Sequence, residues 1–339
     1  MINKPIFFER NKVARVYTGG LLFSDLFGDE KKDSYLPEEW ICSNVKALNK
    51  NSLGEKEGVS KVKDTNIYFD DLLKMHKDEM LGKANNLRIL VKALDSAIRL
   101  PCQAHPDKEF SKKHFNSPYG KTECWYILGT RENAKIYFGF KEGITKEEFE
   151  KAIDDSEKGL DTFSDIMCSF EPKVGEVYLV RAKTVHAIGR GCLILEIQEP
   201  TDFTIQPERY CGEYKLSDEE MYIGLDKEDA LSCFDFKKAQ DPKTKIREIY
   251  NTSGAKKEKL VGPEDTDCFV VNKITLTDGK TPFYVQGSYA IYVVTKGEGK
   301  IIGKDGYEKD IKKGDYFFMS ACIMKNYDLI GNMEIIECY

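Results

Sequence analysis

Short segments rich in β-branched and aromatic residues, separated by glycine-containing turns, recur through most of this sequence. Segments of this kind favour antiparallel strands packed as sandwiches or barrels over a parallel sheet. The predicted strands cover residues 86–94, 122–129, 176–182, 191–198, 268–276, 289–302 and 315–321. Stretches with helical spacing interrupt them, and Thr145 with Glu148 three residues later has the pattern of a capping box. The sequence therefore predicts a mainly β fold with helical insertions at about 50–85, 145–170 and 216–234.

One strand-and-turn unit occurs twice in the sequence. Gly175 precedes the segment EVYLV and is followed eleven residues later by His186. Gly314 precedes DYFFM, and Lys325 stands at the same distance. This frame resembles the second cupin motif, in which the strand after the turn presents a metal-binding histidine to the interior of a barrel. The repeat therefore predicts two cupin-type (jelly-roll) β-barrels or sandwiches.

The two units divide the chain into two expected domains. Residues 1–240 would form an N-terminal, metal-binding cupin domain that carries the helical insertions. Residues 241–339 would form a C-terminal, cupin-like domain. No histidine follows His186 in the sequence, so we expect no second metal site of this kind.

Composition and charge limit the class of protein. The 339 residues are 41% hydrophobic, and no apolar run approaches the ~20 residues of a membrane span. A net charge of −6 without a basic face argues against nucleic acid, although a few Lys or Arg in one pocket would suit a phosphorylated small molecule. The N-terminus lacks a secretory signal, and ten scattered cysteines without a CxxC pair predict free thiols. We therefore expect a cytoplasmic monomer or homodimer with no membrane partner.

Two of the four histidines have sequence surroundings that favour a structural or solvent-exposed position. His76 lies in a helical stretch among charged neighbours, where polar side chains are usually exposed. His114 follows the bend at Pro106 and has lysines beside it, which favours a structural role over a place in a site. These two residues are not predicted to bind a metal.

The segment LPCQAHPD, residues 100–107, places Gln103 and His105 two positions apart. In a strand these side chains share one face, and Glu123 and His186 open later strands that could converge on the same point. Two imidazoles, a carboxylate and an amide oxygen suit Zn²⁺ with a position left for water or substrate. The alternative is that these histidines are hydrogen-bonded residues of an ordinary core, and spacing alone does not decide between the two.

Four segments together resemble type I mannose-6-phosphate isomerase (phosphomannose isomerase), a family of the cupin superfamily. They are QAHPD at 103–107, GKTECWY at 120–126, TVHAIGRG at 184–191 and LEIQEPTD at 195–202. The resemblance implies a catalytic N-terminal domain and a carbohydrate-metabolism enzyme that interconverts mannose 6-phosphate and fructose 6-phosphate. In that reaction a proton moves between C1 and C2 through a cis-enediol.

The same resemblance implies one zinc ion per chain. Its ligands would be His105, Glu123 and His186, with Gln103 as a fourth and weaker one. A zinc ion with an open position can hold the negative charge that develops on the oxygen beside the reacting carbon, while a base removes the proton.

The sequence departs from the family at one position. In the family an arginine stands four residues after the aspartate that Asp202 matches, whereas this chain has Gln206 there and Arg209 three residues later. Glutamine donates hydrogen bonds but brings no charge, which would weaken stabilisation of an enediolate. The alternative function is therefore a non-catalytic or weakly active cupin that binds a sugar phosphate.

Further polar residues alternate toward the expected interior of the barrel. Lys121 shares a strand face with Glu123, and Glu196 shares one with Gln198. Lys92 lies in an otherwise apolar strand, near the substrate or with its ammonium group reaching an edge of the sheet. The predicted catalytic residues are Gln206, Lys121 and Glu196, and the predicted substrate-binding residues are Asp202, Arg209 and Lys92.

Overall fold

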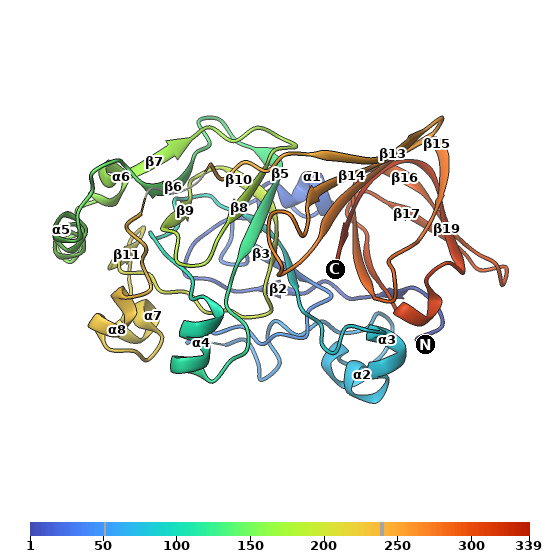
Figure 1. Ribbon diagram of the computed structural model, residues 1–339, viewed down its shortest axis with the longest axis horizontal. Helices are drawn as coiled ribbons and strands as arrows, with labels where there is room; N and C mark the ends of the chain where they lie inside the picture. The colour runs from blue at the N-terminus through green and yellow to red at the C-terminus, as the bar shows by residue number, and fades with distance from the viewer. Residues whose placement is uncertain (51, 238–240) are drawn as a thin grey trace.

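The protein consists of two β-rich halves that lie side by side (Figure 1). The computed structural model describes residues 1–50, 52–237 and 241–339, so the predicted domain boundary at residue 240 falls outside the described residues. The mainly β fold with helical insertions is confirmed. No helix within these ranges is long and apolar enough to cross a lipid bilayer.

The C-terminal half, orange to red in Figure 1, is built on one sheet of eight strands. The order is β1-β18-β16-β19-β15-β14-β13, with β17 paired to β16. Its edge strand β1 comes from the start of the chain, where Ile6 pairs with Phe318. The strands are β1 (Ile6–Phe7), β13 (Arg247–Thr252), β14 (Ala255–Val261), β15 (Val271–Pro282), β16 (Ala290–Gly303), β17 (Glu308–Lys312), β18 (Tyr316–Met319) and β19 (Tyr327–Cys338).

The N-terminal half contains three smaller sheets. The largest has the order β2-β3-β4-β10-β5-β8, a second has the order β7-β6-β9, and β11 pairs with β12. The strands are β2 (Lys12–Val13), β3 (Glu38–Ile41), β4 (Leu90–Asp95), β5 (Glu123–Thr130), β6 (Ile136–Phe140), β7 (Met167–Phe170), β8 (Val177–Val180), β9 (His186–Ile188), β10 (Cys192–Gln198), β11 (Tyr210–Cys211) and β12 (Tyr214–Lys215). The predicted strands of this half therefore belong mostly to the six-stranded sheet.

One face of the six-stranded sheet packs on the C-terminal half. Leu193, Leu195 and Ile197 of β10 belong to an apolar core that also contains Val271 and Ile336 of the large sheet. Successive side chains of a strand point to opposite faces, so the intervening residues of β10 point away from this shared core.

The opposite, inner face of the same sheet packs on the three-stranded sheet. Ile127 of β5 and Ile194 of β10 share an apolar cluster with Ile136 and Ile188 of the smaller sheet. The alternation along β10 places Glu196 on this inner face. Polar residues of the N-terminal half are thereby collected between two sheets.

The helices lie mainly between strands of the N-terminal half. The capping box predicted at Thr145 is confirmed, since its side chain accepts from the Glu148 N–H and its own N–H donates to Oε2 of Glu148. Helix α4 was not expected, and it begins where the Asp107 carboxylate accepts from the N–H of Phe110. The helices are α1 (Phe23–Phe27), α2 (Phe69–Met75), α3 (Lys77–Leu81), α4 (Lys108–Phe115), α5 (Lys146–Ser156), α6 (Phe163–Ile166), α7 (Asp218–Tyr222) and α8 (Lys227–Leu231).

The repeated unit is present in both halves, but its two copies end differently. Gly175 and Gly314 have φ of 90° and 93°, and each stands two residues before a strand, β8 or β18. His186 begins β9. Lys325 instead lies in an exposed turn with φ of 73°, because a 3₁₀ turn at Ala321–Ile323 delays the start of β19 to Tyr327. Lys325 is therefore not the structural counterpart of His186.

Candidate metal and sugar-phosphate site

Three of the predicted metal ligands come from different parts of the fold. Glu123 begins β5 in the six-stranded sheet, and His186 begins β9 in the sheet that faces it. His105 follows an isolated antiparallel bridge between Gln103 and His186. Partners in such a bridge have side chains on the same face, so Gln103 lies beside His186.

The side chains of these residues meet in one buried cluster. Nε2 of His105 lies 3.1 Å from Nε2 of His186 and 3.2 Å from Oε2 of Glu123. Nε2 of His186 lies 3.6 Å from Oε1 of Glu123. Each of the three residues is at most 1% exposed. The structure thus brings together three potential metal ligands that the sequence separates by up to 81 residues.

Backbone hydrogen bonds orient both imidazole rings. Nδ1 of His105 lies 2.9 Å from the carbonyl oxygen of Phe203, and Nδ1 of His186 lies 2.8 Å from that of Thr184. A carbonyl oxygen only accepts, so the proton of each neutral ring is on Nδ1. Both Nε2 atoms then present lone pairs toward one another, and Nζ of Lys121 lies 2.9 Å from Nε2 of His105. A cation shared by the two imidazoles would stabilise this arrangement.

The charge states of the cluster also favour a cation. Burial lowers the pKa of His105 to about 3, and the nearby ammonium group of Lys121 adds to the shift. Burial lowers the pKa of His186 as well. Burial acts to raise the pKa of Glu123, but Lys121 and the neighbouring imidazoles outweigh it, so this pKa lies well below its ordinary value. At neutral pH the cluster is two neutral imidazoles and one carboxylate.

These distances are compatible with a tetrahedral metal centre. Zinc binds histidine nitrogen and carboxylate oxygen at about 2.0–2.2 Å, which places neighbouring ligand atoms about 3.4 Å apart. Nε2 of His105 lies 3.1 Å from Nε2 of His186 and 3.2 Å from Oε2 of Glu123, close to that value, and one ligand atom from each residue lies within 4.8 Å of the others. Oε2 of Glu123 is also buried without a hydrogen bond, although Nζ of Lys121 lies 3.1 Å away. His105, Glu123 and His186 could therefore hold a divalent metal ion.

A cavity of about 970 Å³ opens beside the cluster. It lies at the upper end of the size range usual for small-molecule sites. Seven of the ten predicted site residues line it: Gln103, Lys121, Glu123, Lys92, Glu196, Asp202 and Gln206. Glu123 of the cluster and these polar side chains thus face one common space, whereas His105 and His186 are not among the residues that line it.

One row of cross-strand neighbours runs along the inner face of the six-stranded sheet. The register pairs Trp40 with Lys92, Lys92 with Glu196, and Glu196 with Trp125. Nζ of Lys92 lies 3.4 Å from Oε1 of Glu196, and both residues are buried. Burial, together with the charge of Glu123, raises the pKa of Glu196 to about 7, and Lys92 partly opposes this. Glu196 can therefore exchange a proton near neutral pH.

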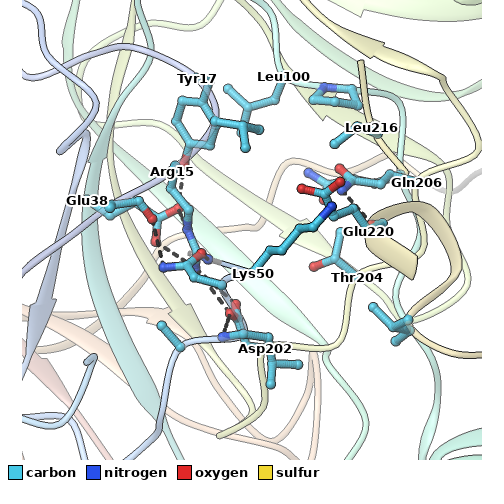
Figure 2. Close-up of a pocket in the computed structure, with 18 of the residues that line it drawn as sticks. Arg15, Tyr17, Glu38, Lys50, Leu100, Asp202, Thr204, Gln206, Leu216 and Glu220 are labelled. Carbon is cyan, nitrogen blue, oxygen red and sulfur yellow. Dashed lines mark hydrogen bonds and ion pairs between the residues drawn. The ribbon is translucent and has the colours of Figure 1, made fainter. Parts of the chain in front are cut away.

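A group of charged residues lies at another wall of the cavity (Figure 2). The Arg15 guanidinium donates to both Glu38 and Asp202, with Nε 2.8 Å from Oε1 of Glu38 and Nη2 3.1 Å from Oδ1 of Asp202. Lys92 adds its charge, with Nζ 3.6 Å from Oδ1 of Asp202. Burial opposes ionisation of Asp202, but Arg15 and Lys92 outweigh it and keep its pKa below the ordinary value. Asp202 is thus an anchor for two cations.

Gln206 lines the opposite side of the cavity. Its Nε2 donates to the backbone oxygen of Glu220 at 2.9 Å, and its N–H donates to that of Met221. Figure 2 shows the side chain of Lys50 crossing the cavity toward Gln206 and Glu220. A lysine thus approaches the place where the family resemblance led us to expect an arginine.

Arg209 is not brought to this cavity. Its Nε donates to Glu157 at 2.7 Å, Nη2 to Asp218 at 2.7 Å and Nη1 to the backbone oxygen of Leu216 at 2.9 Å. All five N–H groups of a guanidinium point in fixed directions, so these bonds hold it toward α5 and α7. The predicted substrate-binding role of Arg209 does not agree with this geometry.

We expect Arg209→Ala to leave catalysis nearly unchanged, with kcat and KM within about threefold of wild type. The ion-pair partners are partly to largely exposed, 40% for Glu157 and 77% for Asp218, so the free energy of unfolding should fall by only about 1 kcal/mol. Steady-state kinetics and urea unfolding of the same preparation measure both effects. A tenfold or larger rise in KM would return Arg209 to the site.

The other two histidines lie outside the cluster, as the sequence suggested. His76 terminates α2. His114 stacks on Phe110 with ring centres 4.4 Å apart, and its Nδ1 lies 3.8 Å from Asp229. Neither belongs to the group of potential metal ligands found among the described residues.

Several residues of the cavity wall were missed in the sequence. Arg15, Tyr17 and Glu38 come from segments in which no motif stands out, and only the side-chain hydrogen bonds from Arg15 and Tyr17 to Glu38 reveal them. Trp125 is not a cavity-lining residue but contacts the cluster, and the sequence indicated its place, because it follows Glu123 by two residues and therefore shares its strand face. Its Nε1 donates to Oε1 of Glu123 at 2.9 Å.

Comparisons with known proteins agree with this picture. The family model described as "Mannose-6-phosphate isomerase, cupin domain" matches residues 259–339, in the C-terminal half. The mannose-6-phosphate isomerase ManA of Bacillus subtilis is 28% identical over 94% of this chain and 94% of its own length. The probable mannose-6-phosphate isomerase GmuF of the same organism is 27% identical over 94% and 93%.

A solved structure shares the fold. The crystal structure of the mannose 6-phosphate isomerase from Bacillus subtilis superposes with a TM-score of 0.80 and 23% identity, covering 99% of both chains. The resemblance read from the sequence motifs is therefore confirmed. The chain is related over almost its whole length to the mannose-6-phosphate isomerases, and residues 259–339 match the cupin domain of that family.

Proposed function

We propose that this protein is a zinc-dependent isomerase that interconverts mannose 6-phosphate and fructose 6-phosphate. The observation that carries the proposal is the buried group of His105, Glu123 and His186, of which Glu123 lines a cavity large enough for a sugar phosphate. Relatives that bear the name of this activity support it. Zinc is proposed over other divalent metals because the donors are two imidazole nitrogens and one carboxylate oxygen.

The residues of the cavity have distinct proposed roles. A bound zinc ion would polarise the sugar oxygen next to the reacting carbon. Glu196, whose pKa is raised to about 7, is suited to take the proton from one carbon and return it to the other. Lys121, with Nζ 3.1 Å from Oε2 of Glu123, can donate a hydrogen bond to a sugar oxygen near the ligands. Gln103 is proposed as a fourth and weaker ligand.

The negatively charged substrate requires cations in the cavity. Lys92 is buried, and its Nζ lies 3.4–3.9 Å from three carboxylates, so it can turn a donor toward a hydroxyl or phosphate oxygen. Asp202 holds both Lys92 and Arg15 in place. We propose these residues as the substrate-binding wall.

All residues of the proposed site precede residue 240, which supports the proposal that residues 1–240 form the catalytic domain. Residues 241–339 would then be a cupin-like domain without a metal site. We further propose that the enzyme acts in the cytoplasm.

Metal analysis combined with a coupled assay tests the proposed function. Purified protein should contain about one zinc ion per chain and convert mannose 6-phosphate into fructose 6-phosphate. Glucose 6-phosphate serves as the matched control substrate, because it differs only in configuration at C2. Absence of stoichiometric metal together with absence of turnover would contradict the proposal.

A second candidate function is a sugar-phosphate-binding module with little or no activity. It is favoured by Gln206, which lines the cavity without a charge and is hydrogen-bonded to the backbone at Glu220.

Gln206→Arg separates the two functions. If the protein is an isomerase weakened by the uncharged side chain at position 206, the substitution should raise kcat about tenfold or more, because a guanidinium stabilises developing negative charge better than an amide. Gln206→Met removes the amide without adding charge and serves as the control. Saturable binding of mannose 6-phosphate with no turnover in any of the three proteins would favour the binding module.

A further inference from the structure

The two tryptophans of this chain repeat one local arrangement. Trp40 follows Glu38 by two residues on β3, and Trp125 follows Glu123 by two residues on β5. Each indole N–H donates to its carboxylate, at 2.7 Å from Trp40 to Oε2 of Glu38 and at 2.9 Å from Trp125 to Oε1 of Glu123. Both tryptophans are fully buried. They stand in the same cross-strand row, on either side of the Lys92–Glu196 pair.

The bond from Trp125 makes the two oxygens of Glu123 unequal. Oε1 accepts the indole N–H, whereas Oε2 is buried, accepts no hydrogen bond of good geometry and is paired with the ammonium group of Lys121 at 3.1 Å. Oε2 is also the nearer oxygen to His105, at 3.2 Å from its Nε2. The carboxylate oxygen that the indole leaves available is therefore the one turned toward His105 and Lys121.

The position of Trp125 is itself tightly fixed. Its side chain packs among Ile127, Tyr178 and Ile194 in the inner core, and its ring centre lies 5.5 Å from that of His186 in an edge-on arrangement. An indole held in this way cannot swing aside, so its N–H defines where Oε1 of Glu123 can lie.

We propose that Trp125 is a positioning residue: its hydrogen bond occupies Oε1 of Glu123, so that Oε2 is the only oxygen of this carboxylate that binds the metal. This inference rests on the proposed metal site and extends it. A carboxylate that used both oxygens would fill an additional coordination position, whereas a single oxygen leaves that position open to a sugar oxygen. Hydrogen-bond partners of metal ligands commonly change metal affinity by about 10- to 100-fold when removed.

Trp125→Phe removes the indole N–H and keeps an aromatic ring. We expect its zinc affinity, measured by competition with a chromophoric chelator, to fall about 10- to 100-fold. Trp40→Phe is the matched control, because it removes the same type of bond to a carboxylate of the same sheet face, and Glu38 is not a proposed ligand. Its zinc affinity should stay within about threefold of wild type. Equal affinity of Trp125→Phe and wild type would overturn the inference.

The wild-type protein offers a second readout that does not depend on the stability of a variant. With only two tryptophans, its ¹H–¹⁵N spectrum has two indole signals, which Trp40→Phe assigns by the loss of one. Adding zinc should shift the Trp125 signal and leave that of Trp40 nearly in place. A Trp125 signal that does not move while zinc binds would overturn the inference and leave the proposed metal site standing. If the wild-type protein binds no zinc, the proposed metal site and the proposed role of Trp125 are both wrong.

Discussion

Replacing His105 with asparagine is expected to abolish zinc binding and to lower kcat/KM for mannose 6-phosphate by at least about 1000-fold. The Nε2 atom that faces His186 and Glu123 is removed, and polarisation of a sugar oxygen by a metal contributes several kcal/mol to catalysis. Asparagine is chosen because its amide can still donate to the backbone oxygen of Phe203, as Nδ1 of His105 does. The backbone around the site should therefore keep its position.

Thermal unfolding gives a readout for this variant that is independent of activity. Zinc at 1000 times its dissociation constant stabilises a folded protein by about 4 kcal/mol, so added zinc should raise the unfolding midpoint of wild type and not of His105→Asn. His114→Asn is the matched control, because His114 packs on Phe110 away from the cluster. It should respond to zinc as wild type does. Zinc-dependent stabilisation of His105→Asn equal to that of wild type would contradict the assignment of the ligand.

The strands and their faces could be predicted because the alternation of side chains is a local property. The period of two along residues 191–198 correctly placed Glu196 on the inner face, and the same rule placed Lys121 and Glu123 together. The group of His105, Glu123 and His186 was predictable for a different reason. Four separate segments matched one family, and this joint match chose, among four histidines, the two that the structure brings together with Glu123.

The charged wall around Arg15 could not be predicted, because it depends on long-range pairing. Arg15 and Asp202 are 187 residues apart and meet only when the N-terminal segment packs beside the six-stranded sheet. No local pattern encodes such a contact. Arg209 is the opposite case: its closeness to Gln206 in sequence suggested a place in the site, whereas in the structure its side chain is hydrogen-bonded to Glu157 and Asp218 and does not line the cavity.

Glu196→Gln is expected to lower kcat by about 100- to 10,000-fold while zinc binding is retained, because glutamine cannot take up the proton. In wild type the proposed base is the ionised form of Glu196. With its pKa raised to about 7 by burial and by the charge of Glu123, kcat/KM should rise as the pH increases through about 7. A bound zinc ion favours the carboxylate and would move this limb to lower pH. The residual activity of Glu196→Gln should lack this rise of kcat/KM with pH. If the rise is unchanged in the variant, the proton transfer belongs to another group.

The stability of the same variant should depend on pH in a direction set by the pKa shift. The pKa of Glu196 is raised in the folded protein from its ordinary value of 4.5, so folding favours the neutral form. Glu196 therefore leaves the free energy of unfolding of wild type unchanged below pH 4.5, lowers it progressively between pH 4.5 and about 7, and lowers it by a constant amount above pH 7. Glutamine resembles the neutral form, so the free energy of unfolding of zinc-free Glu196→Gln should match that of wild type near pH 4.5 and exceed it at pH 8 by up to about 3 kcal/mol.

Lys92→Met provides the opposite test. Without the ammonium group 3.4 Å away, ionised Glu196 loses a compensating charge, so the free energy of unfolding should fall more steeply toward pH 8 than it does in wild type. Urea unfolding of the three proteins at pH 5 and pH 8 measures these differences, and a Glu196→Gln protein that is less stable than wild type at pH 8 would show that Glu196 is ionised and satisfied in the folded state.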